Sequence, residues 1–552
     1  MQLKPLVLTS CVGIIVLLPL FARGAGVVNN CTDSDLRTAM AGGGTVTFAC
    51  DGTIYVWPTL SIAANTVLDA SGHQIKLSGG NSGTVIQVNQ GVTVSLINLT
   101  ICNGQSHDGT NGYLDINSSP GDPGGGIYNA GTLTLLNCNV VTNRTGNGGH
   151  AYGGNGINPL GGSGGSGGGI YNAGILALSD CIVSGNMTGN GGASGGGTWY
   201  PAGGTGGPGG GIYNAGTLYM KCSTISSNAT GYGPDNTMSG PGADGGAGSG
   251  VWSGGTFMAD SCTFNDNFTG YGGHGGLSDM SGGPGGAGGS GGALYNSGIS
   301  ALTNCSLIWN STGNGGSGGS GWLGGNGANG PVGAGAAICN QSNLFLVNCT
   351  IVTNRIGGGV CNAGGSTWPL NTLVALNSGN AQDVSGVFLS LGCNLIGAAS
   401  SSGFVAPGDR VGSAASPIDP KLASLADNGG PTMTMALLSG SPAIDAGTSA
   451  GAPATDQRGI ARPQGRGVDI GAYEFQFTIP QITGAGFQSA SSFWLQSCGL
   501  PNQTYMVQTS TNLLNWCDAI NVLADSNGVF EFVDSNHGDD SAKFYRLKSS
   551  IP

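Results

Sequence analysis

The chain has 552 residues, of which 111 are glycine and only 8% are charged, and its formal net charge is −12. These proportions differ from those of an ordinary globular enzyme, while a hydrophobic content of 39% argues against simple disorder. Lys and Arg are sparse in the central repeats, so no basic stripe can neutralise phosphate groups, and nucleic acid is not an expected partner.

The first 24 residues have the pattern of a secretory signal peptide. Lys4 gives a short positive region, an apolar stretch runs to Phe21, and small residues surround Gly24. An uncleaved membrane anchor is the alternative, but Pro19 interrupts the stretch, which is short for a membrane span. No later stretch is long and apolar enough to cross a bilayer. We therefore expect an exported protein, secreted or held at the cell surface, with no transmembrane segment after cleavage.

Residues 25–115 are expected to form an N-terminal cap and the first coils of a repetitive fold. Thr32 or Asp33 could begin a short helix that ends at Gly42. Short β-rich segments follow, separated by Gly, Asn and Ser turns. Strands this short and frequent suit a sheet solenoid or a sandwich.

The cysteines fall into two groups. Export makes them eligible for disulfide bonds, and Cys31 with Cys50, and Cys498 with Cys517, are candidate bridges at the two ends of the chain. Six others occupy one repeat position each, which favours small side chains in a narrow core over a redox or metal column. These six are Cys138, Cys181, Cys222, Cys262, Cys305 and Cys349.

The middle of the chain, residues 116–366, repeats a unit of constant length. The copy GGGIYNAGTLTLLNCNVVTN ends at Asn143, and related copies end at Asn186, Asn228, Asn267, Asn310 and Asn354. In each copy the final Asn follows a Tyr, Trp or Cys by fifteen positions, as Asn143 follows Tyr128. Internal repeats of fixed length indicate a solenoid.

The shortest step between copies gives the size of one coil. Cys339 and Cys361 occupy the same place in ICN and VCN and are 22 residues apart. Twenty-two residues make three short strands and three turns, so the spacing predicts a triangular right-handed parallel β-helix with coils about 4.8 Å apart. The other copies must then carry insertions of roughly twenty residues.

Two columns of asparagine are expected to stack from coil to coil. Amide side chains hydrogen-bond in such ladders and tolerate turn geometry, so a structural role is favoured over a row that contacts ligand. One column precedes the final Asn of each copy and comprises Asn129, Asn172, Asn214, Asn296, Asn340 and Asn362. The other contains the six final asparagines.

The glycine-rich insertions all leave the coil at one corner and must gather on one side of the solenoid. They are either flexible glycine loops or polyproline-II segments that pack side by side, since runs such as GGSGGSGG approach a three-residue glycine period. Four aromatic residues in the insertions could stack on sugar rings or instead fasten the loops to the solenoid. They are Trp199, Tyr200, Tyr271 and Trp322.

Strings that look catalytic lack their structural context. GGSGG at Ser163 fits a nucleophile elbow without a preceding buried strand, and GGHGG at His274 lies in an insertion without aspartate pairs. Asp180, Asp260 and Asp266 are the acids inside the repeated units, and we do not expect them to form a glycosidase pair. No catalytic residue, metal site or cofactor is predicted.

Residues 367–474 carry a second signature, DVSGVFLSLGCNLIG followed by DNGGPTMTMALLSGSPAIDAG and DQRGIARPQGRGVDIGAYE. This stretch resembles bacterial secreted proteins with the choice-of-anchor Q domain, and the GGGIYNAGTLTL repeats are similar to the pectin-lyase-like β-helix found in them. The resemblance implies a secreted or surface β-helix protein whose anchoring varies between members. It implies no particular activity.

The residues of this second signature also predict its structure. We expect closing coils in which Leu389, Leu395 and Ile396 continue the core. Five charged residues are expected to form an ion-pair cluster that fixes the terminal turns. They are Asp445, Asp456, Arg458, Arg462 and Asp469.

Residues 475–552 lose the glycine bias and resemble small immunoglobulin-like β-domains appended to exported proteins of Verrucomicrobia-type bacteria. Tyr505, Trp516, Phe530 and Phe544 are the expected core of a small β-sandwich. Because a typical sorting tail is not evident, this domain is the candidate module for attachment or sorting.

The sequence thus predicts an all-β chain: a right-handed parallel β-helix with glycine-rich insertions at one corner, and a small C-terminal β-sandwich. The favoured function is a non-enzymatic exported scaffold, adhesive or in contact with polysaccharide or cell-envelope components through its glycine-rich side. A polysaccharide lyase or glycoside hydrolase of the pectin-lyase-like fold is the alternative, since fold alone does not fix function.

Overall fold

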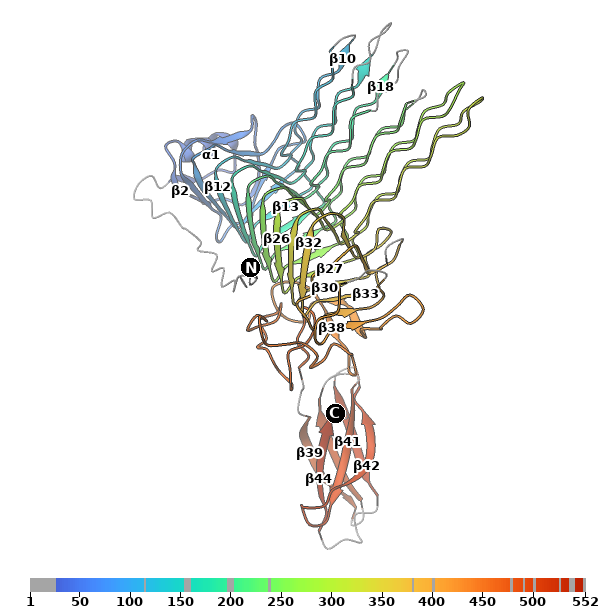
Figure 1. Cartoon of the computed structure of the whole chain (residues 1–552). Helices are drawn as coiled ribbons and strands as arrows, with labels where there is room; N and C mark the ends of the chain where they lie inside the picture. The colour runs from blue at the N-terminus through green and yellow to red at the C-terminus, as the bar shows by residue number, and fades with distance from the viewer. Residues whose placement is uncertain are drawn as a thin grey trace, which may run out of the picture.

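The computed structural model describes most of the chain after the predicted signal peptide (Figure 1). The described ranges are 26–113, 116–152, 160–195, 203–236, 240–379, 382–399, 403–476, 480–489, 492–499, 503–525, 528–535 and 542–549. The signal peptide, residues 1–24, lies outside them. Within these ranges, no helix has the length and apolar character needed to cross a bilayer.

Three parallel sheets form the walls of a β-helix. Sheet I contains β1 (Gly26–Val28), β2 (Gly44–Phe48), β5 (Thr66–Asp69), β8 (Thr93–Ile97), β12 (Thr132–Leu136), β16 (Ile175–Ser179), β20 (Thr217–Lys221), β23 (Thr256–Asp260), β26 (Ile299–Thr303), β29 (Asn343–Val347) and β32 (Ser366–Leu370).

Sheet II contains β3 (Gly52–Tyr55), β6 (Ile75–Ser78), β9 (Leu99–Cys102), β13 (Asn139–Val141), β17 (Ile182–Ser184), β21 (Thr224–Ser226), β24 (Thr263–Asn265), β27 (Ser306–Ile308), β30 (Thr350–Val352), β33 (Leu373–Ala375), β35 (Leu395–Ile396) and β36 (Arg410–Val411).

Sheet III contains β4 (Leu60–Ile62), β7 (Ile86–Val88), β11 (Ile127–Asn129), β15 (Ile170–Asn172), β19 (Ile212–Asn214), β22 (Val251–Ser253), β25 (Leu294–Asn296), β28 (Ile338–Asn340), β31 (Val360–Asn362) and β34 (Val384–Ser385). The predicted all-β class with a parallel β-helix is confirmed.

Equivalent residues of successive coils lie in direct register, and this register builds the core. On β12 and β16, Leu133 pairs with Leu176 and Leu135 with Leu178, and all four side chains are fully buried. The residues between them face outward, as the two-residue period of a strand requires. Burying each leucine contributes about 2 kcal/mol, so the interior columns supply the main stabilisation of the coils.

The final asparagines of the repeats form a continuous hydrogen-bonded ladder. Each side-chain amide donates Nδ2–H to the Oδ1 atom of the next asparagine at 2.8–3.0 Å, from Asn143 through Asn354 to Asn377. The last amide, Asn377, donates to the Asp383 carboxylate at 2.9 Å. Because every amide points the same way, the donor end of the ladder meets an anion.

The second asparagine column is also hydrogen-bonded. Asn129 donates to Asn172 and Asn172 to Asn214 at 2.7 Å, and Asn296 and Asn340 continue the column to Asn362. In the intervening coil Ser253 takes the place of asparagine and accepts from Asn214 at 3.1 Å. The described amides are therefore engaged within the structure.

The predicted cysteine column needs one correction. Cys138, Cys181, Cys262, Cys305 and Cys349 are buried in the core, where thiol groups donate to backbone carbonyls. Cys222 is one residue early: it takes the left-handed turn position (φ 48°), and Ser223 fills the column. The side-chain hydroxyl of Ser223 accepts from the backbone N–H of Cys181, so a small polar residue can replace the thiol there.

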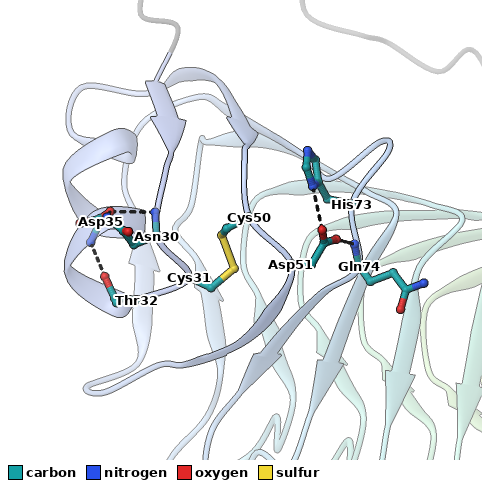
Figure 2. Close-up of a disulfide and its surroundings, with 8 residues drawn as sticks. All are labelled: Asn30, Cys31, Thr32, Asp35, Cys50, Asp51, His73 and Gln74. Carbon is teal, nitrogen blue, oxygen red and sulfur yellow. Dashed lines mark hydrogen bonds and ion pairs between the residues drawn. A yellow bond between two sulfur atoms is a disulfide. The ribbon is translucent and has the colours of Figure 1, made fainter.

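The N-terminal end of the β-helix is covered by α1 (Asp33–Met40). Thr32 caps this helix by accepting the Asp35 N–H, and Leu36 is fully buried in the interior core. A disulfide bond joins Cys31, just before the helix, to Cys50, just after β2 (Figure 2). The cap is thus held by packing, a helix cap and a covalent link.

Residues 418–475 cover the outer face of sheet II. Their antiparallel pair, β37 (Leu422–Ala426) and β38 (Thr434–Leu437), supplies Met435 and Leu437 to a second core with Ile308 and Leu395 of sheet II. The predicted closing coils therefore extend through β36, whereas residues 418–475 form this covering segment in place of further coils. Ile396 does reach the interior core, but Leu389 is 47% exposed.

The predicted charge cluster lies within this covering segment. Arg458 pairs with Asp456 at 2.7 Å, and Arg462 pairs with Glu474 at 2.6 Å, all four side chains being almost fully buried. Asp469 accepts the backbone N–H groups of Asp445 and Phe475. Three carboxyl groups and two guanidinium groups thus share one buried site. Glu474 is a member of this cluster that was not predicted from the sequence.

The C-terminal residues form two antiparallel sheets, in line with the predicted β-sandwich. The first contains β39 (Gln481–Ser489), β40 (Ser492–Cys498) and β43 (Val529–Asp534), and the second contains β42 (Cys517–Leu523), β41 (Thr504–Ser510) and β44 (Phe544–Ser549). Tyr505 and Phe530 stack in the core, as predicted. Trp516 instead lies beneath the Arg546 guanidinium, and Phe544 is exposed.

Breaking the main ladder should destabilise the β-helix. Asn228→Ala removes the partner of four buried groups. The backbone N–H and the Nδ2–H of Asn186 lose their acceptor, and Asn267 Oδ1 and the Val183 carbonyl lose their donor. We expect the free energy of unfolding to fall by about 3 kcal/mol or more, measured by urea denaturation. Asn29→Ala, at an exposed position, is the control and should change it by less than about 0.5 kcal/mol. Equal effects of the two variants would contradict the structural role of the ladder.

The charge cluster should make stability depend on pH. Burial, followed by the charge of Glu474, raises the pKa of Asp469 from 3.8 to about 7. The unfolded chain therefore releases a proton that the folded chain keeps between about pH 4 and pH 7, so the free energy of unfolding falls as pH rises through this window. Asp469→Asn should flatten the fall in urea midpoint, whereas Asp279→Asn, at an exposed site, should not. If the urea midpoint of Asp469→Asn falls with pH as steeply as that of the wild type, the Asp469 carboxyl is not the cause of the fall.

Candidate functional site: the glycine-rich slab

The insertions leave the β-helix after sheet II and return to it before sheet III, as the sequence predicted. Figure 1 shows them projecting side by side from one side of the solenoid. Each has an outgoing limb and a returning limb, and among the described residues the tips of the first three outgoing limbs pair as strands. These are β10 (Gly112–Tyr113), β14 (Ala151–Tyr152) and β18 (Ser194–Gly195).

Backbone hydrogen bonds join the limbs into two layers. Along the outgoing limbs, Gly148 donates to the carbonyl of Asn190 and Gly191 to that of Tyr232, at 2.9–3.0 Å. Along the returning limbs, Gly164 donates to the carbonyl of Thr205 at 3.0 Å. We call this two-layer arrangement, built from the described parts of residues 106–123, 145–166, 188–208, 230–247, 269–290 and 312–334, the glycine slab.

Other backbone hydrogen bonds join the two layers to each other. Gly162 on a returning limb donates to the carbonyl of Gly149 on an outgoing limb at 3.0 Å, and Gly192 on the next outgoing limb donates back to Gly162 at 2.8 Å. The three residues of a triplet therefore have distinct tasks. In Asn147-Gly148-Gly149 the first points its side chain outward, the second bonds within its layer and the third bonds across layers.

This three-residue period matches a polyproline-II helix, which has three residues per turn and no internal hydrogen bonds. Of the two sequence-based alternatives, packed polyproline-II-like segments therefore describe the slab, and free glycine loops do not.

The glycines are required because the limbs are close together. A Cβ atom on Gly148 would lie 1.8 Å from the carbonyl oxygen of Gly162, and one on Gly192 would lie 1.9 Å from that of Gly149. Neither glycine has a positive φ, so the constraint is space and not backbone conformation. Two glycines in three are thus the composition that a two-layer slab demands.

The outer face of the outgoing layer displays side chains in rows across the limbs. Asn147 Oδ1 accepts the backbone N–H of Asn190, and Asn190 Oδ1 accepts that of Tyr232, at 3.0 and 2.9 Å. In the next row outward, His150 Nδ1 accepts the Ala193 N–H at 3.1 Å. Every limb is thereby fixed to its neighbour by side chains as well as by backbone.

The predicted aromatic residues occupy different parts of this slab. Tyr271 is 41% exposed and stacks on Tyr232 of the neighbouring limb, with ring centroids 5.4 Å apart. Trp322 is 90% exposed at the tip of the last limb pair, as is Leu323, and Leu277 and Met280 are exposed at the tip of the preceding pair. Trp199 and Tyr200 lie outside the described residues. The structure does not bring Tyr271 and Trp322 together.

A further aromatic row lies on the outer face of sheet III. Tyr128, Tyr171, Tyr213, Trp252 and Tyr295 stack in register and are half-exposed, with successive ring centroids 5.1, 5.1, 4.3 and 6.3 Å apart. The sequence analysis used this aromatic position to count the repeats but assigned it no surface role. Its fifteen-residue distance from the final asparagine was the available clue.

The acids of the repeated units do not form a catalytic pair. Asp180 occupies a turn with φ 56°, and the register places Lys221 on the coil between it and Asp260. Asp266 occupies another turn, with φ 56°. Ser163 lies on a returning limb of the slab, and His274 Nδ1 accepts a backbone N–H from Ser317 on the next limb. Among the described residues, no group of three or more His, Cys, Asp or Glu side chains could hold a metal ion.

The candidate bridge at the C-terminal end is not formed. Cys498 and Cys517 are free and exposed, and they belong to different sheets of the sandwich, at the end of β40 and the start of β42. Cys31 and Cys50 are joined, as described above.

No family model matches the chain, and no curated protein matches it. The surface chemistry of the glycine slab and of sheet III is therefore the basis for a functional proposal.

A side chain placed between neighbouring limbs of the outgoing layer should open the slab while leaving the β-helix intact. Gly192→Ala places a methyl group against the Gly149 carbonyl, so we expect faster proteolysis of residues 188–195, by about tenfold or more, at an unchanged far-ultraviolet circular dichroism spectrum. Ala193→Ser changes the adjacent outward residue and should leave proteolysis unchanged. If both variants are cut at the wild-type rate, the outgoing limbs are not packed as described.

Proposed function

We propose that the protein is an exported, non-enzymatic scaffold that binds polysaccharide through the outgoing face of its glycine slab. The observation that carries this proposal is the hydrogen-bonded two-layer slab itself. A rigid slab holds its outward side chains at fixed positions, so a ligand does not have to pay the entropy of ordering them. Flexible glycine loops would lose that advantage.

The chemistry of the outgoing face suits a neutral or weakly polar polymer. Tyr232 and Tyr271 offer a stacked aromatic pair, and asparagine and histidine side chains lie on the preceding outgoing limbs. Aromatic residues combine a large apolar ring with a polar edge, which is the combination that a sugar surface requires. Exposed Trp322 extends the aromatic surface to the tip.

The charges support a binding role over cleavage. Glycoside hydrolysis uses two carboxyl groups facing one groove, and the acids of the repeated units are separated by Lys221 or lie on turns. The other large group of ionisable residues, around Asp469, is buried within the covering segment, and the Asp469 backbone carbonyl accepts a hydrogen bond from Asn348 of the β-helix. This cluster therefore serves stability.

Export and surface attachment complete the proposal. They rest on the pattern of the first 24 residues and on the resemblance of residues 367–474 to choice-of-anchor Q proteins. The small sandwich formed by the C-terminal residues is the proposed attachment module. Cell-envelope components or external polysaccharides are the proposed partners.

The test is retention on immobilised polysaccharides combined with an assay for cleavage. We expect the full-length protein to be retained on one or more uncharged members of a panel of neutral glycans, pectins, alginates and sulfated glycans, without producing new reducing or unsaturated ends from any of them. Tyr271→Ala and Trp322→Ala should each weaken retention by about tenfold, equivalent to about 1.4 kcal/mol.

The matched control is Tyr55→Ala, which removes an aromatic residue that is 69% exposed on β3, away from the slab. It should bind like the wild type. Retention that survives both slab substitutions would contradict the assigned surface, and release of new chain ends would favour the lyase or hydrolase alternative.

A further inference from the structure

The outward column of sheet III contains two cysteines on neighbouring coils, followed by Ser385 on the last strand. Cys339 of β28 and Cys361 of β31 are direct register partners, at the position that Tyr128 to Tyr295 fill in the preceding coils. Adjacent strands lie about 4.8 Å apart, which is within the Cα separations that disulfide bonds span. The stacked rings show that side chains at this position point the same way from coil to coil. The two sulfur atoms are therefore side by side.

The environments of the two thiols differ in a way that suits thiol chemistry. Cys361 is half-buried and hydrogen-bonded by Cys339 and Ser385, and these contacts lower the pKa of its thiol from 9.0 to about 6. Cys339 is almost fully buried, and its pKa is raised by the hydrogen bond to Cys361 and by burial. The thiol within reach of solvent is thus the more acidic of the two, and its buried partner holds its proton more tightly.

The interior cysteine column gives an internal comparison. Cys305 and Cys349 also lie on consecutive coils, but both are fully buried and donate to the backbone carbonyls of Ala259, Thr303, Leu302 and Val347. Burial raises the pKa of Cys305 well above its ordinary value. Register alone therefore does not make a pair of cysteines reactive. The sheet III pair differs because one of its thiols is within reach of solvent and has a lowered pKa.

We infer that Cys339 and Cys361 are a redox-active dithiol site that takes a low-molecular-weight disulfide as its oxidant and closes a disulfide bond between adjacent coils. The Cys361 thiolate attacks one sulfur of the oxidant, forming a mixed disulfide and releasing one thiolate. Cys339 then loses its proton and attacks the Cys361 sulfur, which forms the protein disulfide and releases the second thiolate. The oxidant is reduced by two electrons, and the two cysteines are oxidised.

The experiment uses oxidised glutathione as the probe on the folded full-length chain carrying Cys498→Ser and Cys517→Ser, which removes the two exposed thiols of the sandwich. After the remaining thiols are blocked, pepsin digestion and mass spectrometry should find one new linked pair, Cys339 with Cys361. Adding Cys339→Ser should instead trap glutathione on Cys361. Cys361→Ser should abolish both products, and Cys393→Ser, at another half-buried free cysteine, should leave the linkage unchanged.

Three results would overturn the inference: no linked peptide from the folded protein, a glutathione adduct on Cys361 that persists when Cys339 is present, or linkage of Cys305 with Cys349 at the same rate. The linked peptide is sought in the chain that retains both cysteines, so a variant that folds poorly does not remove the test.

Discussion

The in-register stacking of coils at one β-strand spacing is the constraint on which the structure depends. It places equivalent side chains of successive coils above one another, so a side chain that interacts favourably with its own copy makes the same interaction at every coil. Amides do so by hydrogen bonding, which gives the ladder from Asn143 to Asn377, and aromatic rings do so by stacking, which gives the row on sheet III. The insertions obey the same spacing because each begins and ends on a coil. Their limbs are therefore so close together that a side chain between them would clash with a neighbouring carbonyl group. Glycine is required at those positions.

This logic divides the molecule into a structural part and a display part. Leucine, asparagine and buried cysteine columns hold the coils, and the covering segment with its charge cluster fastens onto sheet II. The glycine slab adds almost no apolar core, yet the described limbs are joined by backbone bonds within and between layers. Its outward positions are thereby free to carry side chains chosen for contact. A binding surface on such a slab can be changed one residue at a time without disturbing the coil.

Much of the fold follows from the sequence because a repeat reports its own geometry. The interval from Cys339 to Cys361 gave the bare coil, and the asparagine positions gave both ladders. The conformation of the insertions could not be chosen from sequence, since glycine permits both a loop and a polyproline-II helix, and neighbouring limbs decide between them. Cys222 was wrongly assigned to the buried column, because Ser223, the next residue, can fill that position in place of a cysteine. Covering of sheet II by residues 418–475 was missed because contacts such as Gln457 with Thr263 join residues far apart in the chain. On the candidate surface, Tyr271 and Trp322 were found from composition, whereas Tyr232 was recognised only once the limbs were seen to be adjacent.

The central claim is that the glycine slab is a hydrogen-bonded, rigid body. Amide hydrogen exchange of the native protein, resolved to peptides within residues 145–152 and 160–166, tests it most directly. The account predicts that Gly148, Gly149, Gly162 and Gly164 exchange slowly, with protection approaching that of the strands β12 and β16, because their N–H groups are bonded to neighbouring limbs. Exchange of these glycines at the rate of an unstructured peptide would contradict it and would return the insertions to flexible loops.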